Sequence, residues 1–253
     1  MNKAEYEAMY HVEDTLWWYV GMRRIGEAVL NGRLQPGMRI LDAGCGTGGN
    51  LRWLTRYGTA YGIDLAPEAM DFCRARNLTT VSRASVLDLP FPDQSFDLVT
   101  SFDVIYHLGV ADDVAALREI RRVLKPAGAA LVRVPALELL RSEHDAAVHT
   151  RQRYSLAELT QKAERAGLEV ERASYVNTLL FPLAAASRLM ARWRGGADEQ
   201  HEHRSDVRPA SPVVNALFGT ALDLEATLLA RWDFPVGLSA VAVVRRPIPE
   251  VPA

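Results

Sequence analysis

A glycine-rich segment, "ILDAGCGTGGN" at residues 40–50, constrains the fold more than any other part of this sequence. It follows an apolar run typical of a buried strand and leads into an amphipathic run typical of a helix. Gly44, Gly46 and Gly49 have the spacing G-x-G-x-x-G, in which glycines permit a tight turn and a close approach of the backbone to a ligand. The segment therefore predicts a strand, a ligand-binding turn and a helix in succession.

The alternation of strand and helix continues along the chain. Strands are predicted at 38–44, 60–66, 79–85, 96–104 and 129–136, with helices at 49–58, 66–77 and 112–128. A further helix and strand are expected within 155–177, and a last strand at 237–247. This alternation is typical of a doubly wound α/β sheet with parallel strands. We expect a helical cap at 1–37, the core at 38–176, a helical insert at 177–233, and the last strand with a tail at 234–253.

Charge and composition exclude several classes of protein. Lys and Arg number 29 against 31 Asp and Glu, so no basic excess indicates nucleic-acid binding. The two cysteines, Cys45 and Cys73, are too few for a disulfide framework and fit a reducing, cytoplasmic location. The first ten residues lack the apolar core of a signal peptide. The uncharged stretch 175–187 is shorter than the roughly 20 residues that span a bilayer. We therefore predict no transmembrane segment, while peripheral membrane contact stays open.

An acidic residue ends the second predicted strand. Asp64 lies twenty residues after Gly44, where its carboxylate can accept hydrogen bonds from a ribose diol. The glycine pattern and this aspartate together predict a nucleoside-containing cofactor. Taken alone, they also suit NAD-dependent enzymes.

Four motifs in order narrow this choice. They are "LDAGCGTGG", "YGIDLAPEAM", "LDLPFPDQSFDLV" and "VLKPAGAALVRVP", which span residues 38–135. Together they resemble the class I S-adenosylmethionine-dependent methyltransferases, in particular the small-molecule branch that includes the ubiquinone-type enzymes. The resemblance implies a Rossmann-like, seven-stranded sheet, S-adenosylmethionine as cofactor and S-adenosylhomocysteine as product. The motif "LDAGCGTGG" and the lack of a Tyr-x-x-x-Lys pair disfavour an NAD-dependent reductase.

The resemblance also implies roles for residues of these motifs. Asp42 is expected to order the glycine loop, and Asp64 to hold the ribose hydroxyls with Leu65 against the adenine. The methionine end and ribose side would be lined by Ala43, Gly44, Cys45 and Gly46. Phe102 and Asp103 would form the floor of the site near the methionine moiety.

One position departs from the family pattern. Ser85 stands where many members carry the aspartate that bonds the adenine amino group. A serine can still accept this hydrogen bond, but without charge, and the backbone amide of Val86 can serve adenine N1. The departure puts the cofactor affinity in question but not the identity of the cofactor.

The predicted cap carries aromatic side chains at helical spacing. It either packs on the edge of the sheet or closes as a flap over the cofactor; the sequence leaves both open. Trp17, Tyr19 and Arg23 are the residues that we expect to face the site. An arginine here could pair with the cofactor carboxylate.

The segment "EHDAAVHTRQRYS" at 143–155 follows the fifth strand, so we expect it beside the acceptor. His144, His149, Tyr154 and, after the fourth strand, His107 are candidates for a general base or for orienting the acceptor. Tyr106, Arg151 and Arg153 are candidates for binding it, the arginines through an anionic group. The spacing of His144 and His149 does not stack two imidazoles on a helix, so no metal site is predicted. The segment could instead be structural, with Ser155 and Glu158 forming a capping box.

The insert carries apolar side chains on two predicted helices joined by a mobile loop. They could pack on the core, form a homodimer, or roof an acceptor pocket. We therefore predict in-line methyl transfer to a small-molecule acceptor, apolar or anionic and natural-product-like or lipid-like, with a loop His or Tyr assisting. A peptide, protein or glycan acceptor, or a non-catalytic cofactor-binding scaffold, is the alternative.

Overall fold

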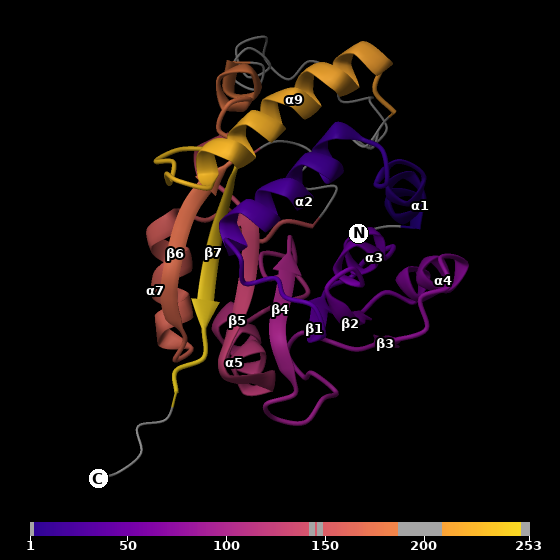
Figure 1. The fold of residues 1–253 in the computed structure, drawn as a ribbon, viewed down its shortest axis with the longest axis vertical. Coiled ribbons are helices and arrows are strands. Elements are labelled where there is room, and N and C mark those ends of the chain that lie inside the picture. The colour runs from indigo at the N-terminus through magenta and orange to yellow at the C-terminus, as the bar shows by residue number, and fades with distance from the viewer. Residues whose placement is uncertain (1–2, 142–144, 146–148, 187–208, 249–253) are drawn as a thin grey trace.

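The computed structural model describes residues 3–141, 145, 149–186 and 209–248 of the chain. Within them, seven strands form one sheet in the order β3-β2-β1-β4-β5-β7-β6 (Figure 1). The strands are β1 Met38–Ala43, β2 Gly58–Asp64, β3 Val81–Arg83, β4 Phe96–Phe102, β5 Leu124–Pro135, β6 Glu169–Val176 and β7 Ser239–Arg245. β7 runs antiparallel to both its neighbours, and the other neighbouring pairs are parallel. The predicted Rossmann-like, seven-stranded α/β fold is confirmed.

Helices cover both faces of the sheet. One face packs against α2 Trp17–Leu30, α3 Gly49–Leu54, α4 Pro67–Ala75 and α9 Pro212–Leu229, and the other against α5 Asp113–Val123 and α7 Leu156–Arg165. Ile40 and Leu41 of β1 point to opposite faces, and both are fully buried. This two-sided burial explains why the central strands read as continuous apolar runs.

Two helices end earlier than the sequence predicts. α3 ends at Leu54 because Gly58 already belongs to β2, where it pairs with Met38. α5 ends at Val123 because Leu124 pairs with Phe96 of β4. The next residue of β5 that pairs with β4 is Ala129, so the Pro-Ala-Gly segment bulges within the strand and does not end the helix.

The predicted cap consists of α1 Lys3–Val12 and α2. α2 lies along the sheet, and α9 packs beside it (Figure 1). Asn215 of α9 fixes the start of α2: its side-chain oxygen accepts a hydrogen bond from the Trp17 amide at 2.7 Å. α9 therefore reaches the sheet largely through α2.

The insert is described only in part. Residues 181–186 are helical and α9 supplies the second predicted helix, whereas the predicted loop lies outside the described residues. By length and composition alone α9 could cross a membrane, a test that a core helix also passes. Its exposed apolar side chains include Val213, Leu217 and Leu224. Cytoplasmic location, homodimerisation and peripheral membrane contact stay predictions.

Candidate active site

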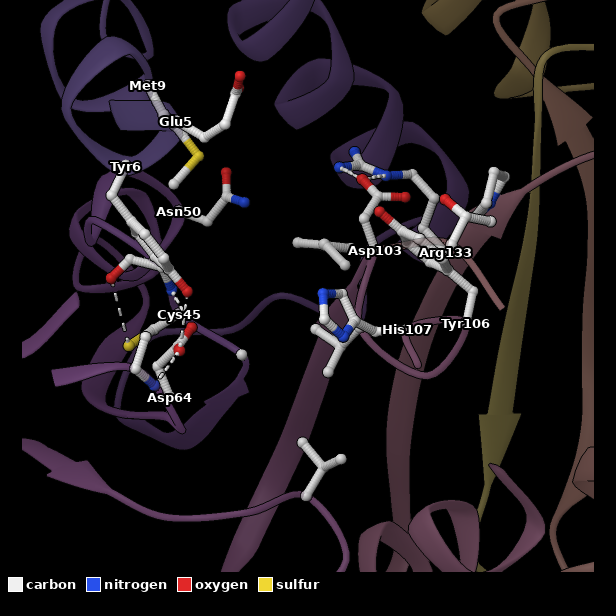
Figure 2. Close-up of a pocket in the computed structure, with 18 of the residues that line it drawn as sticks. Glu5, Tyr6, Met9, Cys45, Asn50, Asp64, Asp103, Tyr106, His107 and Arg133 are labelled. Carbon is white, nitrogen blue, oxygen red and sulfur yellow. Dashed lines mark hydrogen bonds and ion pairs between the residues drawn. The ribbon is translucent and has the colours of Figure 1, made fainter. Parts of the chain in front are cut away.

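A cavity of about 810 Å³ opens where β1, β2, β4 and β5 end (Figure 2). Ligands of open α/β sheets bind at this edge, beyond the carboxyl ends of the strands. Fourteen residues expected at the site line it: Trp17, Tyr19, Gly44, Cys45, Gly46, Asp64, Leu65, Ser85, Val86, Phe102, Asp103, Tyr106, His107 and Arg153.

The loop after β1 wraps closely against the sheet. Gly44 and Gly46 have φ values of 99° and 53°, a conformation that favours glycine. A Cβ on Gly44 would come within 2.1 Å of the Val104 side chain. The amides of Gly44 and Cys45 both donate to the Ile63 carbonyl at 2.8 Å. The glycines thus leave the floor of the cavity open for a ligand.

Asp64 ties this loop to the end of β2. Its Oδ2 accepts the Gly46 amide at 3.0 Å, and its Oδ1 accepts the Ala66 amide at 3.0 Å. The hydroxyl of Tyr6 donates to the same Oδ1 at 3.2 Å (Figure 2). The carboxylate therefore lies on the wall of the cavity, held between the glycine loop and α1.

The first helix of the cap, α1, covers the glycine loop, whereas the residues of the cap expected to face the site all belong to α2. A Cβ on Gly46 would lie 2.9 Å from the methyl group of Met9. Glu13, just after α1, accepts a hydrogen bond from the Thr47 hydroxyl and pairs with Arg76 at 2.9 Å. Tyr6, Met9 and Glu13 lie at i, i+3 and i+7, a helical stripe that could have identified this contact.

Arg23 does not line the cavity. Its Nη2 donates to the backbone carbonyl of Glu13 at 2.7 Å, so it fixes the turn between α1 and α2. The expectation that Arg23 faces a ligand is therefore corrected: its charge supports the cover of the site. Trp17 and Tyr19, from the same helix, do line the cavity.

The side of the cavity beyond β2 is mostly apolar. Leu65 lines it and is 56% exposed, so its side chain is accessible to a ligand. The Ser85 hydroxyl accepts the Leu87 amide at 3.1 Å and so stabilises its own turn. Val86 is buried and lines the cavity.

A charged pair occupies the ends of β4 and β5. The Nε and Nη2 of Arg133 both donate to Oδ2 of Asp103, the Nε at 3.0 Å. The guanidinium carbon lies 5.1 Å from the Trp18 ring centre and 4.9 Å from that of Phe102. No local sequence pattern indicates these contacts with aromatic rings, so Arg133 was not among the residues expected at the site.

Two residues of β1 lie beneath the cavity: Asp42, expected to order the glycine loop, and Ala43, expected to line the cofactor. Asp42 is buried and accepts a hydrogen bond from the Thr100 hydroxyl at 2.8 Å. Burial raises the pKa of the Asp42 carboxyl to about 7, against the lowering effect of Thr100. Ala43 is fully buried. Both support the loop from below, and neither lines the cavity.

His107 is the histidine that lines the cavity among the described residues. Figure 2 shows it between Asp64 on one side and the Asp103–Arg133 pair on the other. Its Nδ1 accepts the Gly109 amide at 3.2 Å. Burial, with a contribution from His149, lowers the pKa of His107 to about 4. The ring is therefore neutral at physiological pH.

The other histidines of the acceptor-side segment are not placed at the cavity. His149 is exposed and does not line it, although its ring centre lies 5.7 Å from that of His107. His144 lies outside the described residues. Of the candidate catalytic histidines that the structure describes, His107 is therefore the one at the cavity.

Tyr154 and Arg151 point away from the cavity, which corrects two further expectations. The Tyr154 hydroxyl is fully buried and donates to Asp113 of α5 at 2.7 Å. Arg151 reaches the same carboxylate at 2.9 Å. Arg153 does line the cavity, but it is paired with Asp145 at 2.9 and 3.0 Å. The predicted capping box of Ser155 and Glu158 is confirmed.

The polar groups that line the cavity suit an organic cofactor. The described residues hold no group of three His, Cys, Asp or Glu side chains that could bind a metal. The tightly packed glycine loop, the carboxylate of Asp64 and the exposed Leu65 fit a backbone-bound nucleoside with an amino-acid tail.

Comparison with known proteins agrees with this fit. A family model described as "Methyltransferase domain" matches residues 41–132. A probable S-adenosylmethionine-dependent methyltransferase from Mycolicibacterium smegmatis is 32% identical over 221 residues, covering 83% of this chain and 82% of that protein. A fatty-acid O-methyltransferase from the same organism is 40% identical over 98 residues, 36% of this chain and 35% of that enzyme.

Solved structures share the fold. A putative sarcosine dimethylglycine methyltransferase from Galdieria sulphuraria aligns with a TM-score of 0.57 at 22% identity, over 91% of this chain and 86% of that one. Geranyl diphosphate methyltransferase, solved with geranyl diphosphate and sinefungin, aligns with a TM-score of 0.58 at 16% identity, over 89% and 77%. With the sequence relatives, these findings show that the chain belongs to the class I S-adenosylmethionine-dependent methyltransferases.

Proposed function

We propose that this methyltransferase acts on a small-molecule acceptor bound in the same cavity as the cofactor. The observation that carries the proposal is the continuity of the cavity. It joins Asp64 and the glycine loop to a second group of side chains at Arg133, Tyr106 and Arg153. One part would hold the cofactor and the other the acceptor, with His107 between them.

The protein's part in the reaction is alignment and exclusion of water. When bound, S-adenosylmethionine supplies an electrophilic methyl carbon, whose bond to sulfur breaks as its bond to the acceptor forms. Asp64 would accept hydrogen bonds from the ribose, and the loop at Gly44 would let the methionine portion approach the backbone. Tyr6 and Met9 of α1 would cover the bound nucleoside. Holding two reactants in line accounts for a large part of such a rate increase.

We propose that His107 orients the acceptor. A neutral imidazole whose Nδ1 accepts the Gly109 amide carries its proton on Nε2. In that state Nε2 donates a hydrogen bond and does not take a proton. A group with this pKa is also a weak base at neutral pH. The acceptor would then lose its proton to solvent or as the methyl group transfers.

The described part of the insert does not support an apolar roof. No residue of α9 lines the cavity, whose cover comes from α1 and α2. The acceptor end carries two ion pairs, Asp103–Arg133 and Asp145–Arg153, among aromatic rings. A polar small molecule therefore fits better than a wholly lipid-like one.

Calorimetric titration with S-adenosylmethionine and S-adenosylhomocysteine tests the cofactor half of the proposal. Wild type should bind both, and Asp64→Ala should weaken binding at least about tenfold, the loss of roughly 1.4 kcal/mol of hydrogen bonding. Asp64→Asn, which keeps an acceptor oxygen, should lose less. Thermal unfolding of each variant separates a binding defect from misfolding. Absence of binding by folded wild type would overturn the proposal.

A further inference from the structure

The cavity extends beyond the reach of a cofactor held at Asp64. Its far end is lined by Pro135 at the end of β5, Leu238 and Ser239 where β7 begins, and Asn177 just after β6. β6 is five strands from β2 in the sheet order. At about 4.8 Å per strand this is roughly 24 Å. A cofactor whose ribose is bound at Asp64 would therefore leave the far end of the cavity free for a second molecule.

This far end contains a polar atom without a partner. Asn177 is 4% exposed, and its Oδ1 is buried with no hydrogen-bond partner among the described residues. Nearer the middle of the cavity, beside His107, the hydroxyl of Thr150 is likewise buried without a partner among the described residues. An unpaired buried polar group costs about 1–3 kcal/mol. A ligand that pairs with these groups would recover that cost.

Arg133 offers the complementary group. Its Nε and Nη2 are held by Asp103, whereas its Nη1 has no hydrogen-bond partner within the described residues. The Arg133 side chain is buried and its guanidinium lies between two rings, which fixes its position. It therefore provides a donor with a fixed position on the wall of the same cavity that Asn177 lines.

A residue that does not line the cavity stabilises the backbone conformation of Asn177. Its φ of 59° is uncommon for a residue other than glycine. Glu225 of α9 stabilises it by accepting three consecutive backbone amides, those of Asn177, Thr178 and Leu179. A rotation about the last side-chain torsion of Asn177 presents either polar atom of its amide to the cavity.

Aromatic rings complete the walls. Trp18 and Tyr19 meet edge to face with ring centres 4.8 Å apart, and both line the cavity together with Tyr106. We propose that the acceptor is a hydroxylated ring compound, that its ring packs on these aromatic walls, and that Asn177 determines specificity by pairing with one of its hydroxyls. The inference rests on the proposed function. A sugar ring and a phenolic ring share this chemistry, whereas a hydrocarbon would leave Asn177 unpaired.

Three sets of probes separate these chemistries. Radiolabelled methyl transfer and ligand-observed NMR on the S-adenosylhomocysteine complex would be measured with methyl glycosides, with dihydroxybenzoates, and with oleate and a sterol. Either the glycosides or the dihydroxybenzoates should bind and accept the methyl group, and the result identifies which of the two ring classes the acceptor belongs to. Asn177→Leu should lower kcat/KM for that class about tenfold or more, mainly through KM, as expected for a lost buried hydrogen bond. Asn177→Asp, which keeps an acceptor oxygen, should retain more.

The control is the same substitution at the other end of the cavity. Asn50→Leu, beside the glycine loop, should alter cofactor affinity and leave the preference among probes unchanged. Preference for oleate or the sterol would overturn the inference, as would an unaltered KM in Asn177→Leu. So would a complex that binds S-adenosylhomocysteine but neither ring class. Failure to bind S-adenosylhomocysteine would instead overturn the proposed function.

Discussion

Asp113 joins residues that the sequence suggested were catalytic to the structural core. Its Oδ2 accepts hydrogen bonds from Tyr154 at 2.7 Å, Arg151 at 2.9 Å and Lys162 at 2.6 Å. Although burial opposes it, these donors, led by Lys162, lower the pKa of Asp113 to about 2. The cluster fixes the chain just before Ser155 to α5. It thereby positions Arg153 at the cavity without taking part in the chemistry.

Removing the Tyr154 hydroxyl tests this structural role. Tyr154→Phe should lower the free energy of unfolding by about 1 kcal/mol, the usual value of one intramolecular hydrogen bond. Its kcat and the cofactor affinity should stay at the wild-type values. Urea unfolding and a methyl-transfer assay on the same preparations give both quantities. Loss of methyl transfer without loss of stability would return Tyr154 to the candidate catalytic residues.

The lowered pKa of His107 predicts an effect on stability with a definite sign. In the unfolded chain the imidazole gains a proton near pH 6.5, whereas in the folded protein it does so only near pH 4. Between these values the unfolded state binds more protons, so stability falls as the pH falls. His107→Gln should remove this contribution. The difference in urea midpoint between about pH 7.5 and about pH 5 should therefore be smaller in the variant; an equal difference would contradict the assigned pKa.

At the scale of single residues, the sequence predicted which parts of the backbone lie at the cavity better than it predicted which way side chains point. Gly44, Gly46 and Asp64 belong to a contiguous motif whose geometry is local, and all three line the cavity. Arg23 and Tyr154 were expected there because they lie near the right edge of the sheet. Which way their side chains turn depends on partners distant in the sequence, and no local pattern reveals those partners.

At the scale of elements, the described part of the insert packs on the core, one of the three arrangements that the sequence left open. α9 packs on α2 and reaches the site through Glu225, which is fully buried and accepts three backbone amides beside Asn177. The sequence predicted a helix here from its apolar content. Glu225 was overlooked because a single acid within an apolar helix usually faces solvent, and its partners are almost fifty residues away.

Glu225 provides the prediction at this scale. Glu225→Gln replaces one acceptor oxygen with a donor that cannot pair with backbone amides, which should cost about 1–3 kcal/mol of stability. The KM for the acceptor should rise, because Asn177 loses its support, while the cofactor affinity stays unchanged. Glu164→Gln, on the exposed surface of α7, is the matched control and should change neither. Equal losses of acceptor and cofactor binding in Glu225→Gln would indicate general unfolding rather than positioning.

At the scale of the whole molecule, the sequence predicts the sheet more directly than it predicts the order of the last strands and the helix that covers the glycine loop. Alternating apolar and amphipathic runs predict a doubly wound sheet because each buried strand needs helices on both faces. The antiparallel β7 and the packing of α1 over the glycine loop have no such local signature. They arise from contacts between the two ends of the chain and the core, as in the bond between Tyr6 and Asp64.

The contacts of α1 are concentrated on the part of the core that would hold the cofactor. Tyr6 bonds Asp64, Met9 lies against Gly46, and Glu13 pairs with Thr47 and Arg76. A helix held mainly by such contacts opens more readily than the core strands. A ligand that fills the space beneath it should therefore stabilise α1 more than the rest of the molecule.

Hydrogen exchange with and without S-adenosylhomocysteine measures this effect. Exchange of backbone amides in α1 should slow markedly in the complex, whereas exchange in α7, on the opposite face of the sheet, should change little. Tyr6→Phe, which removes the bond to Asp64, should speed exchange in α1 of the free protein and leave α7 unchanged. If α1 exchanged at the same rate in both states while calorimetry showed binding, the helix would be a fixed part of the core and not a cover that the cofactor stabilises.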